Sequence, residues 1–213
     1  MTTDTNDHEH DHEHDHAHEH EHEHEHEHEG GHDYVDEVER IRAGKDAFFK
    51  SSHSSPIPHD ARHDFSGLPY FAVDPSLRFE DLSLEPYTGA EPSAFRIPTS
   101  DGQLRPAHRA GTFTFERDGA PRRLTAYVLD DSPGDSLFVP FLDATSAHET
   151  YGAGRYLDLE AEPDGTYSLD FNLAYHPYCV YDENYSCPLT PVENRLPIRI
   201  EAGERLPEAG TAG

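Results

Sequence analysis

The sequence predicts a mainly β domain, an antiparallel barrel or sandwich with one N-terminal helix, preceded by a disordered tail. Short apolar or alternating stretches follow residue 70 and are separated by Asp-Gly turns about every 10–20 residues. Residues 33–50 carry a helical pattern, whereas residues 1–32 consist largely of His, Asp and Glu. The 213 residues suit a single domain, placed at 33–206, with disordered residues at 1–32 and 207–213.

The tail, residues 1–32, has His at every even position from 8 to 28. Acidic residues fill nearly every gap, so the segment is too poor in apolar residues to fold alone, and Gly30-Gly31 is the expected hinge. In an extended chain, side chains at i and i+2 share a face and create overlapping imidazole pairs. We therefore expect the tail to bind or buffer divalent transition metals such as Zn, Ni, Cu or Co. The expected ligands are His8, His10, His12, His14, His16, His18, His20, His22, His24, His26 and His28. The alternative is a solvated polyanionic segment without a metal function; an expression tag is disfavoured because acids alternate with the histidines.

The charge of the chain is strongly negative, with 43 acidic against 16 basic residues and a net charge of -27. The first 29 residues hold twelve acids and no base, so removing their contribution still leaves -15. Such a balance, with Lys45 and Lys50 the only lysines, is typical of salt-adapted proteins, in which salt screens the repulsion. The field of this surface disfavours nucleic acid and anionic membranes as partners. No apolar run reaches a membrane span and no secretory signal is visible, so we expect a cytoplasmic protein with reduced cysteines.

The helix expected at residues 33–50 has Asp33 as its cap. Its apolar face should pack against the domain and comprises Tyr34, Val38, Ile41 and Phe48, flanked by Val35 and Phe49. Residues 51–69 contain three prolines and a glycine and should lack regular structure. His59 and His63 lie there at i and i+4; we expect exposed loop histidines, with a metal pair as the alternative.

The strands are expected where short apolar or alternating stretches occur. These are residues 77–84, 94–98, 112–116, 123–129 and 136–142, with turns at Asp101-Gly102 and Asp118-Gly119. Pro140 lies inside the last stretch and indicates an edge strand or a bulge, since proline cannot donate a ladder hydrogen bond.

A further hairpin is expected around Pro163-Asp164-Gly165. A two-residue turn would set apolar against polar residues, whereas a three-residue loop pairs Leu159 with Leu169 and Leu157 with Phe171. The three-residue loop is the better choice and places Gly165 in the left-handed position of a bulge.

This register sets Asp158 opposite Asp170 and Tyr156 opposite Asn172 on the other face of the hairpin. Facing carboxylates repel and need solvent, a shared proton, a metal or a neighbouring arginine. Either this face is solvated, or it lines a pocket for a small polar ligand that can support acid-base chemistry. The candidate pocket residues are Glu149, Arg155, Tyr156, Asp158, Asp170, Asn172, Tyr178, Glu193 and Asn194.

Both cysteines lie in a tyrosine-rich stretch after this hairpin. His176, Cys179 and Cys187 could supply three zinc ligands, with Asp182 or Glu193 as the fourth. The spacing does not match the paired patterns of zinc sites, so the simpler interpretation is two small buried residues in a loop.

Several uncommon runs together resemble one family. They are Glu149-Thr-Tyr-Gly-Ala-Gly-Arg-Tyr-Leu-Asp, Asp170-Phe-Asn-Leu-Ala-Tyr-His-Pro-Tyr-Cys-Val-Tyr, Ser186-Cys-Pro-Leu-Thr-Pro-Val-Glu-Asn-Arg-Leu-Pro-Ile and Glu201-Ala-Gly-Glu. With Phe49-Lys50, Ser55-Pro56 and Phe65-Ser-Gly-Leu-Pro-Tyr-Phe, they resemble domain-of-unknown-function family 1684 of bacteria and archaea over about residues 37–204. The family pattern has Asn where this chain has His176, which argues against a family-wide metal site there. The resemblance implies a coherent fold and no assigned activity.

Two classes of function stay open from the sequence. One is a non-catalytic β domain carrying a metal-buffering tail, and the other is an enzyme or binder with a polar pocket. No nucleophile elbow, phosphate loop or dinucleotide fingerprint names a reaction.

Overall fold

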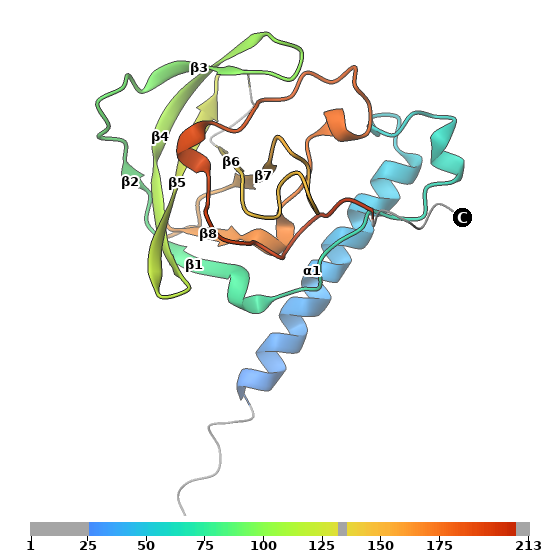
Figure 1. The fold of residues 1–213 in the computed structure, drawn as a ribbon. Coiled ribbons are helices and arrows are strands. Elements are labelled where there is room, and N and C mark those ends of the chain that lie inside the picture. The colour runs from blue at the N-terminus through green and yellow to red at the C-terminus, as the bar shows by residue number, and fades with distance from the viewer. Residues whose placement is uncertain (1–25, 132–135, 208–213) are drawn as a thin grey trace, which may run out of the picture.

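A computed structural model describes residues 26–131 and 136–207, with side chains from Asp33 onward. The chain combines one α-helix with antiparallel strands, as the sequence predicts (Figure 1). The helix α1 (His26–Ser51) runs along one side of the strands, and its first turns extend beyond them. It begins seven residues before the predicted start, so Gly30 and Gly31 lie within the helix rather than in a hinge.

The strands form two antiparallel sheets. They are β1 (Arg78–Leu82), β2 (Glu85–Pro86), β3 (Ala94–Pro98), β4 (Leu104–Arg117), β5 (Ala120–Leu129), β6 (Leu137–Phe141), β7 (Arg155–Leu159) and β8 (Tyr167–Asp170). Five short 3-10 helices cover Ala61–His63, Pro75–Leu77, Phe171–Leu173, Tyr178–Val180 and Val192–Asn194. The larger sheet has the order β2-β4-β5-β6-β7 with β3 also on β4, and the smaller sheet pairs β1 with β8. No closed barrel is found in the described part of the chain.

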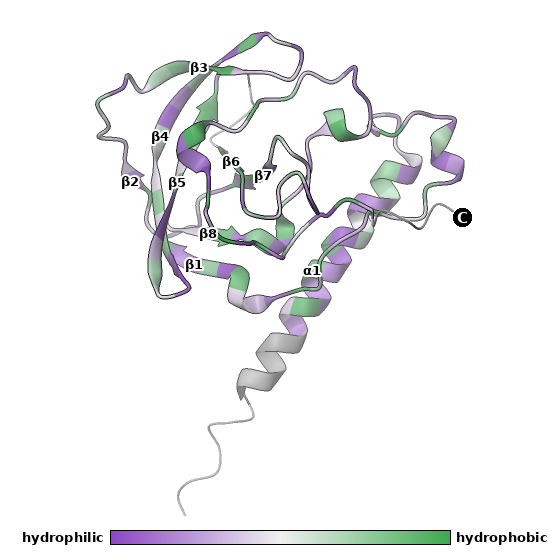
Figure 2. Cartoon of the chain, in the orientation of Figure 1, coloured by the Kyte–Doolittle hydropathy of each residue, from purple (hydrophilic) through white to green (hydrophobic). Residues whose placement is uncertain are grey.

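The predicted Asp-Gly turns are confirmed. In the β4–β5 hairpin, Asp118 and Gly119 have φ angles of 56° and 66° between the paired residues Arg117 and Ala120. Positive φ at both central residues is the type I′ geometry, which matches the twist of the strands. Hydrophobic and hydrophilic residues alternate along these strands, so that one face turns toward the core (Figure 2).

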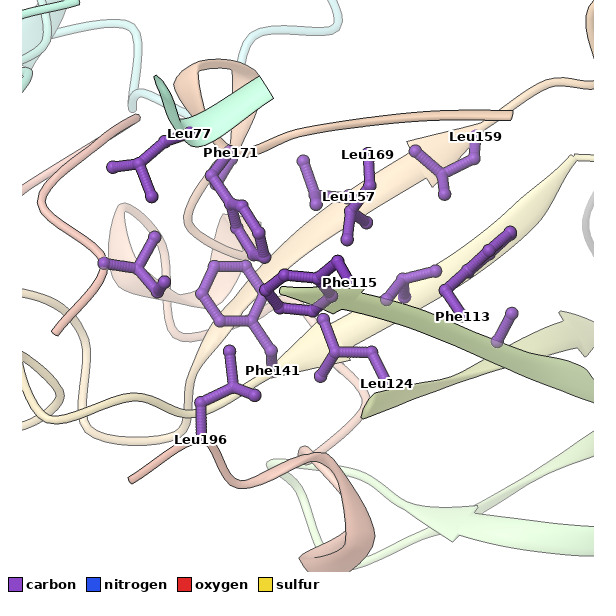
Figure 3. Packing of buried hydrophobic residues seen from close by; sticks show 14 of the residues in the cluster. Leu77, Phe113, Phe115, Leu124, Phe141, Leu157, Leu159, Leu169, Phe171 and Leu196 are labelled. Carbon is purple, nitrogen blue, oxygen red and sulfur yellow. The ribbon is translucent and has the colours of Figure 1, made fainter. Parts of the chain in front are cut away.

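The main core lies between the two sheets and centres on aromatic rings (Figure 3). The ring centroid of Phe171 lies 5.1 Å from that of Phe141, 5.5 Å from Phe115 and 6.1 Å from Phe79. Contacts at these distances add about 0.5–1.5 kcal/mol per pair to the burial of the rings. The core also contains Leu157, Leu159 and Leu169, so the apolar face expected for the hairpin is the buried one.

The three-residue loop of the predicted hairpin is confirmed, whereas the predicted pairing of its two strands is wrong. Glu162 N–H donates to Thr166 O at 2.8 Å, and Gly165 takes a φ of +85°, as the three-residue loop requires. Beyond the loop the strands separate.

The two strands then join different sheets. In β7 Asp158 lies opposite Phe138 of β6, and in β8 Asp170 lies opposite Arg78 of β1. The pairing of Asp158 with Asp170 is therefore wrong. The apolar side chains of both strands reach one core without a shared ladder, and each backbone finds its hydrogen bonds in another strand.

Pro140 lies in an interior strand, not at an edge. Its partner in β7 is Tyr156, whose own N–H and C=O bond to Tyr175, on the far side from β6. On the other side, β6 pairs with β5 only at Phe138 and Tyr127, and the side chain of Asn194 occupies the gap.

The Asn194 amide replaces the missing ladder. Its Nδ2 donates to Thr125 O and Pro140 O, both at 2.7 Å, and its Oδ1 accepts from Thr125 N–H at 2.8 Å. Proline is tolerated because its absent N–H and its carbonyl point toward this side-chain bridge.

The buried face of α1 differs from the predicted one. Tyr34, Val38 and Phe49 are buried, whereas Ile41 and Phe48 are 47% and 38% exposed. Arg42 and Lys45 complete the contact face, with Arg42 donating to Phe71 O and Asn172 O at 2.9 and 3.1 Å. Because Arg42 and Lys45 are cationic, a prediction from the apolar residues alone selects a helix face that is rotated by part of a turn from the observed contact face.

We expect Asn194→Ala to lower the free energy of unfolding by about 3 kcal/mol or more, because three buried backbone groups lose their partner. Denaturant unfolding at fixed salt measures this value. The neighbouring Val192→Ala, at a side chain 81% exposed, is the control and should stay within about 0.5 kcal/mol of the parent. A cost below about 1 kcal/mol for Asn194→Ala would contradict the bridging role.

Candidate functional site

Arg155 is a buried structural residue rather than a pocket residue. Its side chain is 1% exposed and its guanidinium donates to the carbonyls of Ile200, Ala202 and Glu204. Asp143 supplies the counter-charge, with its Oδ1 3.4 Å from Arg155 Nη2. Burial lowers the pKa of Arg155, and Asp143 opposes that shift. Arg155 thus ties the C-terminal segment, residues 200–204, to β7.

Glu204, at the end of that segment, joins three parts of the chain. Its carboxylate accepts from His176 N–H at 2.7 Å and from the Tyr181 hydroxyl at 2.9 Å, and it pairs with the Lys45 ammonium of α1. Gly203 permits this approach: its φ is +75°, and a Cβ there would lie 2.5 Å from Ala174 O. Glycine is needed at this position because a Cβ would collide with the backbone carbonyl oxygens around it.

His176 is a buried neutral base. Its Nε2 accepts from Tyr151 N–H at 3.2 Å, which places the proton on Nδ1. Burial lowers its pKa to about 3, and the charges of Arg155 and Lys45 act in the same direction. Glu204 Oε2 lies 3.7 Å from Nδ1 and would favour a charged ring, but that oxygen already accepts two closer hydrogen bonds. Burial therefore prevails.

Asp170 and Asn172 hold α1 against the strands. The Tyr34 hydroxyl lies 2.9 and 2.8 Å from the two Asp170 oxygens, and Asn172 Nδ2 donates to that hydroxyl at 2.9 Å. Asn172 also exchanges hydrogen bonds with the backbone of Asp74 at 2.8 Å. Both residues serve as attachment points for the helix.

The remaining polar candidates are dispersed over the structure. Glu149 pairs with Arg199 on the surface, and Glu193 accepts from Tyr127 and Arg109. Asn194 bridges β5 and β6, as described above. The nine predicted residues therefore do not converge on one site.

The candidate zinc ligands His176, Cys179 and Cys187 do not form a metal site in the structure. His176 Nε2 is occupied by Tyr151 N–H, and Cys187 Sγ accepts from Cys179 N–H at 3.3 Å. Burial raises the pKa of the Cys187 thiol to about 12, which opposes the thiolate that a metal needs. In residues 26–131 and 136–207, no group of three or more His, Cys, Asp or Glu side chains is arranged to hold a metal ion.

The tail histidines from His8 to His24 lie outside the described residues, and His26 and His28 fall in the first turn of α1. No helix in the described ranges combines the length and the apolar character needed to cross a membrane.

Three of the candidates do meet, in a recess of about 440 Å³ that we call the tyrosine pocket. Tyr156 and Asp158 reach it from β7, and Tyr178 reaches it from the loop that follows β8. Its lining residues are Lys45, Arg105, Leu129, Phe138, Tyr156, Asp158, Tyr175, Pro177, Tyr178, Tyr185, Ser186, Cys187 and Pro188. Four tyrosines in one recess form an apolar wall whose hydroxyls can orient a ligand.

The walls of the tyrosine pocket are held in place by their own contacts. The ring centroids of Tyr156 and Phe138 are 4.7 Å apart, and the Tyr156 hydroxyl donates to Pro188 O. Tyr178 and Tyr185 meet edge to face at 5.3 Å. The pocket is therefore largely preformed, which lowers the entropy cost of binding.

Asp158 supplies the anionic group of the tyrosine pocket. Its Oδ2 accepts from the Tyr175 hydroxyl at 2.5 Å. The side chain keeps contact with solvent at the mouth, yet the surrounding protein raises its pKa, an effect that Tyr175 and Lys45 partly oppose. Asp158 also lines a second recess of about 360 Å³ between α1 and the ends of β7 and β8, where Asp170 lies.

Sequence reasoning missed Lys45, Arg105, Tyr175 and Tyr185 in this pocket. The tyrosines recur at short intervals between residues 175 and 185, a signal of an aromatic surface that was available in the sequence. Lys45 and Arg105 could not be found in this way, because they belong to α1 and β4, which are distant from this stretch in the sequence.

We expect His176 to make stability depend on pH. The folded chain keeps His176 neutral down to about pH 3, whereas the unfolded chain binds a proton near the ordinary pKa of 6.5. The contribution is therefore complete above pH 6.5 and is lost as the pH falls toward 3. Between pH 6.5 and 4.5 the parent should lose about 2–3 kcal/mol more stability than His176→Asn, in which an amide oxygen can still accept from Tyr151 N–H.

Denaturant unfolding of both chains across this pH range measures the difference, and parallel curves would contradict the buried neutral imidazole. Exposed His63→Asn is the control and should follow the parent curve.

Comparisons with known proteins identify a family without an activity. The family model described as a protein of unknown function, DUF1684, matches residues 63–205, about two thirds of the chain. The solution NMR structure of an uncharacterized protein from Haloarcula marismortui is 38% identical, with a TM-score of 0.62, and the match covers 84% of this chain and 97% of that one. No functionally curated protein matches. The chain belongs to the DUF1684 family.

Proposed function

We propose that the folded domain is a binding module for a small organic molecule, with the tyrosine pocket as its site. The observation that carries this proposal is a preformed recess that combines four tyrosine rings with one solvent-accessible carboxylate, Asp158. A wall of mostly apolar and aromatic side chains with a small number of polar groups is the usual composition of a small-molecule site. The alternative site, built from Arg155, Asp170, Asn172 and Asn194, lacks support because those side chains hold the fold together.

The pocket favours binding over catalysis of a named reaction. Tyr175 stays protonated because burial and Asp158 raise its pKa well above the ordinary value, so it donates a hydrogen bond and cannot act as a base near neutral pH. The two thiols of Cys179 and Cys187 are free, but the raised pKa of Cys187 makes that thiol a poor nucleophile.

A second function is proposed for the N-terminal residues on the independent ground of their sequence. Eleven histidines at alternate positions, separated by acids in every gap but that of Ala17, offer imidazole and carboxylate ligands for Zn, Ni, Cu or Co. The same acids favour protonated imidazole, so protons compete with metal and binding should weaken below neutral pH. The chain would then combine a metal-binding N-terminal segment with a ligand-binding domain.

We expect small aromatic and aliphatic fragments, screened against the full chain by ¹H–¹⁵N NMR, to shift amide signals of residues 156–158 and 175–188. Tyr185→Ala should weaken the binding of these fragments by about tenfold, because it removes one ring from the wall. Tyr185→Phe keeps the ring and is the matched control. Tyr87→Ala removes a tyrosine ring outside the lining residues and should leave binding unchanged. Fragments that bind elsewhere, or equal binding by Tyr185→Ala and the parent, would contradict the pocket.

We expect a chain lacking residues 1–25 to lose most of its Ni²⁺ and Zn²⁺ binding sites, since nine of the eleven tail histidines are removed. Isothermal titration calorimetry of the full and shortened chains gives the stoichiometry. The control replaces the same histidines by Asn and keeps every acid, which separates imidazole ligation from attraction to a polyanion. Equal stoichiometry in the full and shortened chains would place the metal in the folded domain.

A further inference from the structure

We propose that the tyrosine pocket selects an organic monocation, an alkylammonium group on a small apolar body, with Asp158 as its counter-ion. This inference rests on the proposed binding function of the pocket and adds the chemical class of the ligand. It follows from the charges on the pocket wall, the arrangement of the rings and the ligand set around Asp158.

The charges of the pocket leave one anion without a cationic partner. Lys45 pairs with Glu204, and Arg105 Nε lies 2.7 and 2.9 Å from the two Asp131 oxygens. Asp158 accepts only from the neutral Tyr175 hydroxyl, and no cationic group in the described residues lies within ion-pair distance of it. The pocket with its paired neighbours therefore carries one net negative charge.

The aromatic wall is suited to a cation. The Lys45 ammonium already lies 4.7 Å from the ring centroid of Tyr175, which shows that a face of this wall accommodates positive charge. Tyr156, Tyr178 and Tyr185 line the same recess. Rings attract an ammonium group through their negative faces, most strongly where water is partly excluded.

The surroundings of Asp158 strengthen its attraction for a cation. The surrounding protein removes part of the hydration of this solvent-accessible carboxyl and raises its pKa, so its negative charge is only partly compensated. A bound cation would supply that compensation. The net charge of -27 further concentrates cations around the chain.

The ligand set favours an organic cation over a metal ion. A hard metal ion requires several oxygen ligands, whereas the pocket offers one carboxylate among phenol rings and apolar residues. Within the described ranges no group of three or more metal-binding side chains occurs. An alkylammonium group needs a single counter-ion and gains the remainder of its affinity from contact with the rings.

Three probes of one shape test the proposal. They are choline, its neutral isostere 3,3-dimethylbutan-1-ol, and the anion 3,3-dimethylbutanoate. NMR titration of the full chain, in the lowest salt concentration that keeps it folded, gives each Kd and maps each site. Low salt is needed because salt screens an accessible ion pair. We expect choline to bind about tenfold more tightly than the isostere, and the anion to bind most weakly.

Asp158→Asn should weaken choline binding about five- to tenfold and leave the Kd of the neutral isostere within about twofold. The unchanged isostere shows that the pocket is still folded. Glu160→Gln is the matched control, since it removes the same charge from an exposed residue two positions along the chain, and it should bind choline as the parent does.

The outcomes separate this inference from the proposed function. Equal Kd values for choline and its isostere in the pocket would overturn the cation assignment and leave a binding site for apolar molecules. Tighter binding of the anion would also overturn it and assign recognition to Arg105 and Lys45. Absence of binding by all three probes at residues 156–158 and 175–188 would count against the pocket itself as well as its charge preference.

Discussion

The buried guanidinium of Arg155 is the interaction on which the rest of the structure depends. Residues 200–204 cross the domain without forming a strand, so their carbonyls need partners other than a regular ladder. Arg155 donates to three of these carbonyls, while Asp143 balances its charge and accepts from Ile200 N–H at 2.7 Å. Removal of either charged group would leave the other buried and unpaired, at a cost of about 3–5 kcal/mol.

The contacts of Arg155 fix the position of Glu204, and Glu204 in turn holds residues that lie at the tyrosine pocket. Its carboxylate pairs with the ammonium of Lys45 in α1 and accepts hydrogen bonds from the Tyr181 hydroxyl and the His176 backbone N–H. Lys45 then contacts the ring of Tyr175, the tyrosine that donates to Asp158. A buried polar network of this kind is stabilising when its members have partners, and here it connects the C-terminal segment to the tyrosine pocket.

The excess of acidic residues affects the electrostatics of the surface rather than those of the buried network. Buried carboxylates such as Asp143 and Glu204 each face a basic partner, whereas exposed pairs such as Arg123 with Glu85 contribute at most about 1 kcal/mol. The excess of acids therefore repels itself at low ionic strength and is screened in concentrated salt, where the Debye length falls to about 3 Å.

The sequence by itself determined the local structure: the approximate positions of β3, β5 and β6, the Asp-Gly turns, the loop closed by Gly165, the apolar face of β7 and β8, and the family. These features depend on alternation and turn chemistry within a few residues. Only the tertiary structure decided that β8 pairs with β1, that Asn194 fills the gap beside Pro140, and that Lys45 and Arg105 line the same recess as Asp158. The identity of a polar residue does not show which group it will bond to. Arg155 and Asn172 are buried and Asp158 lies at a pocket mouth, yet the residues next to them in the sequence do not distinguish these cases. Which of them holds the fold together and which lies at a recess depends on burial and on groups distant in the chain.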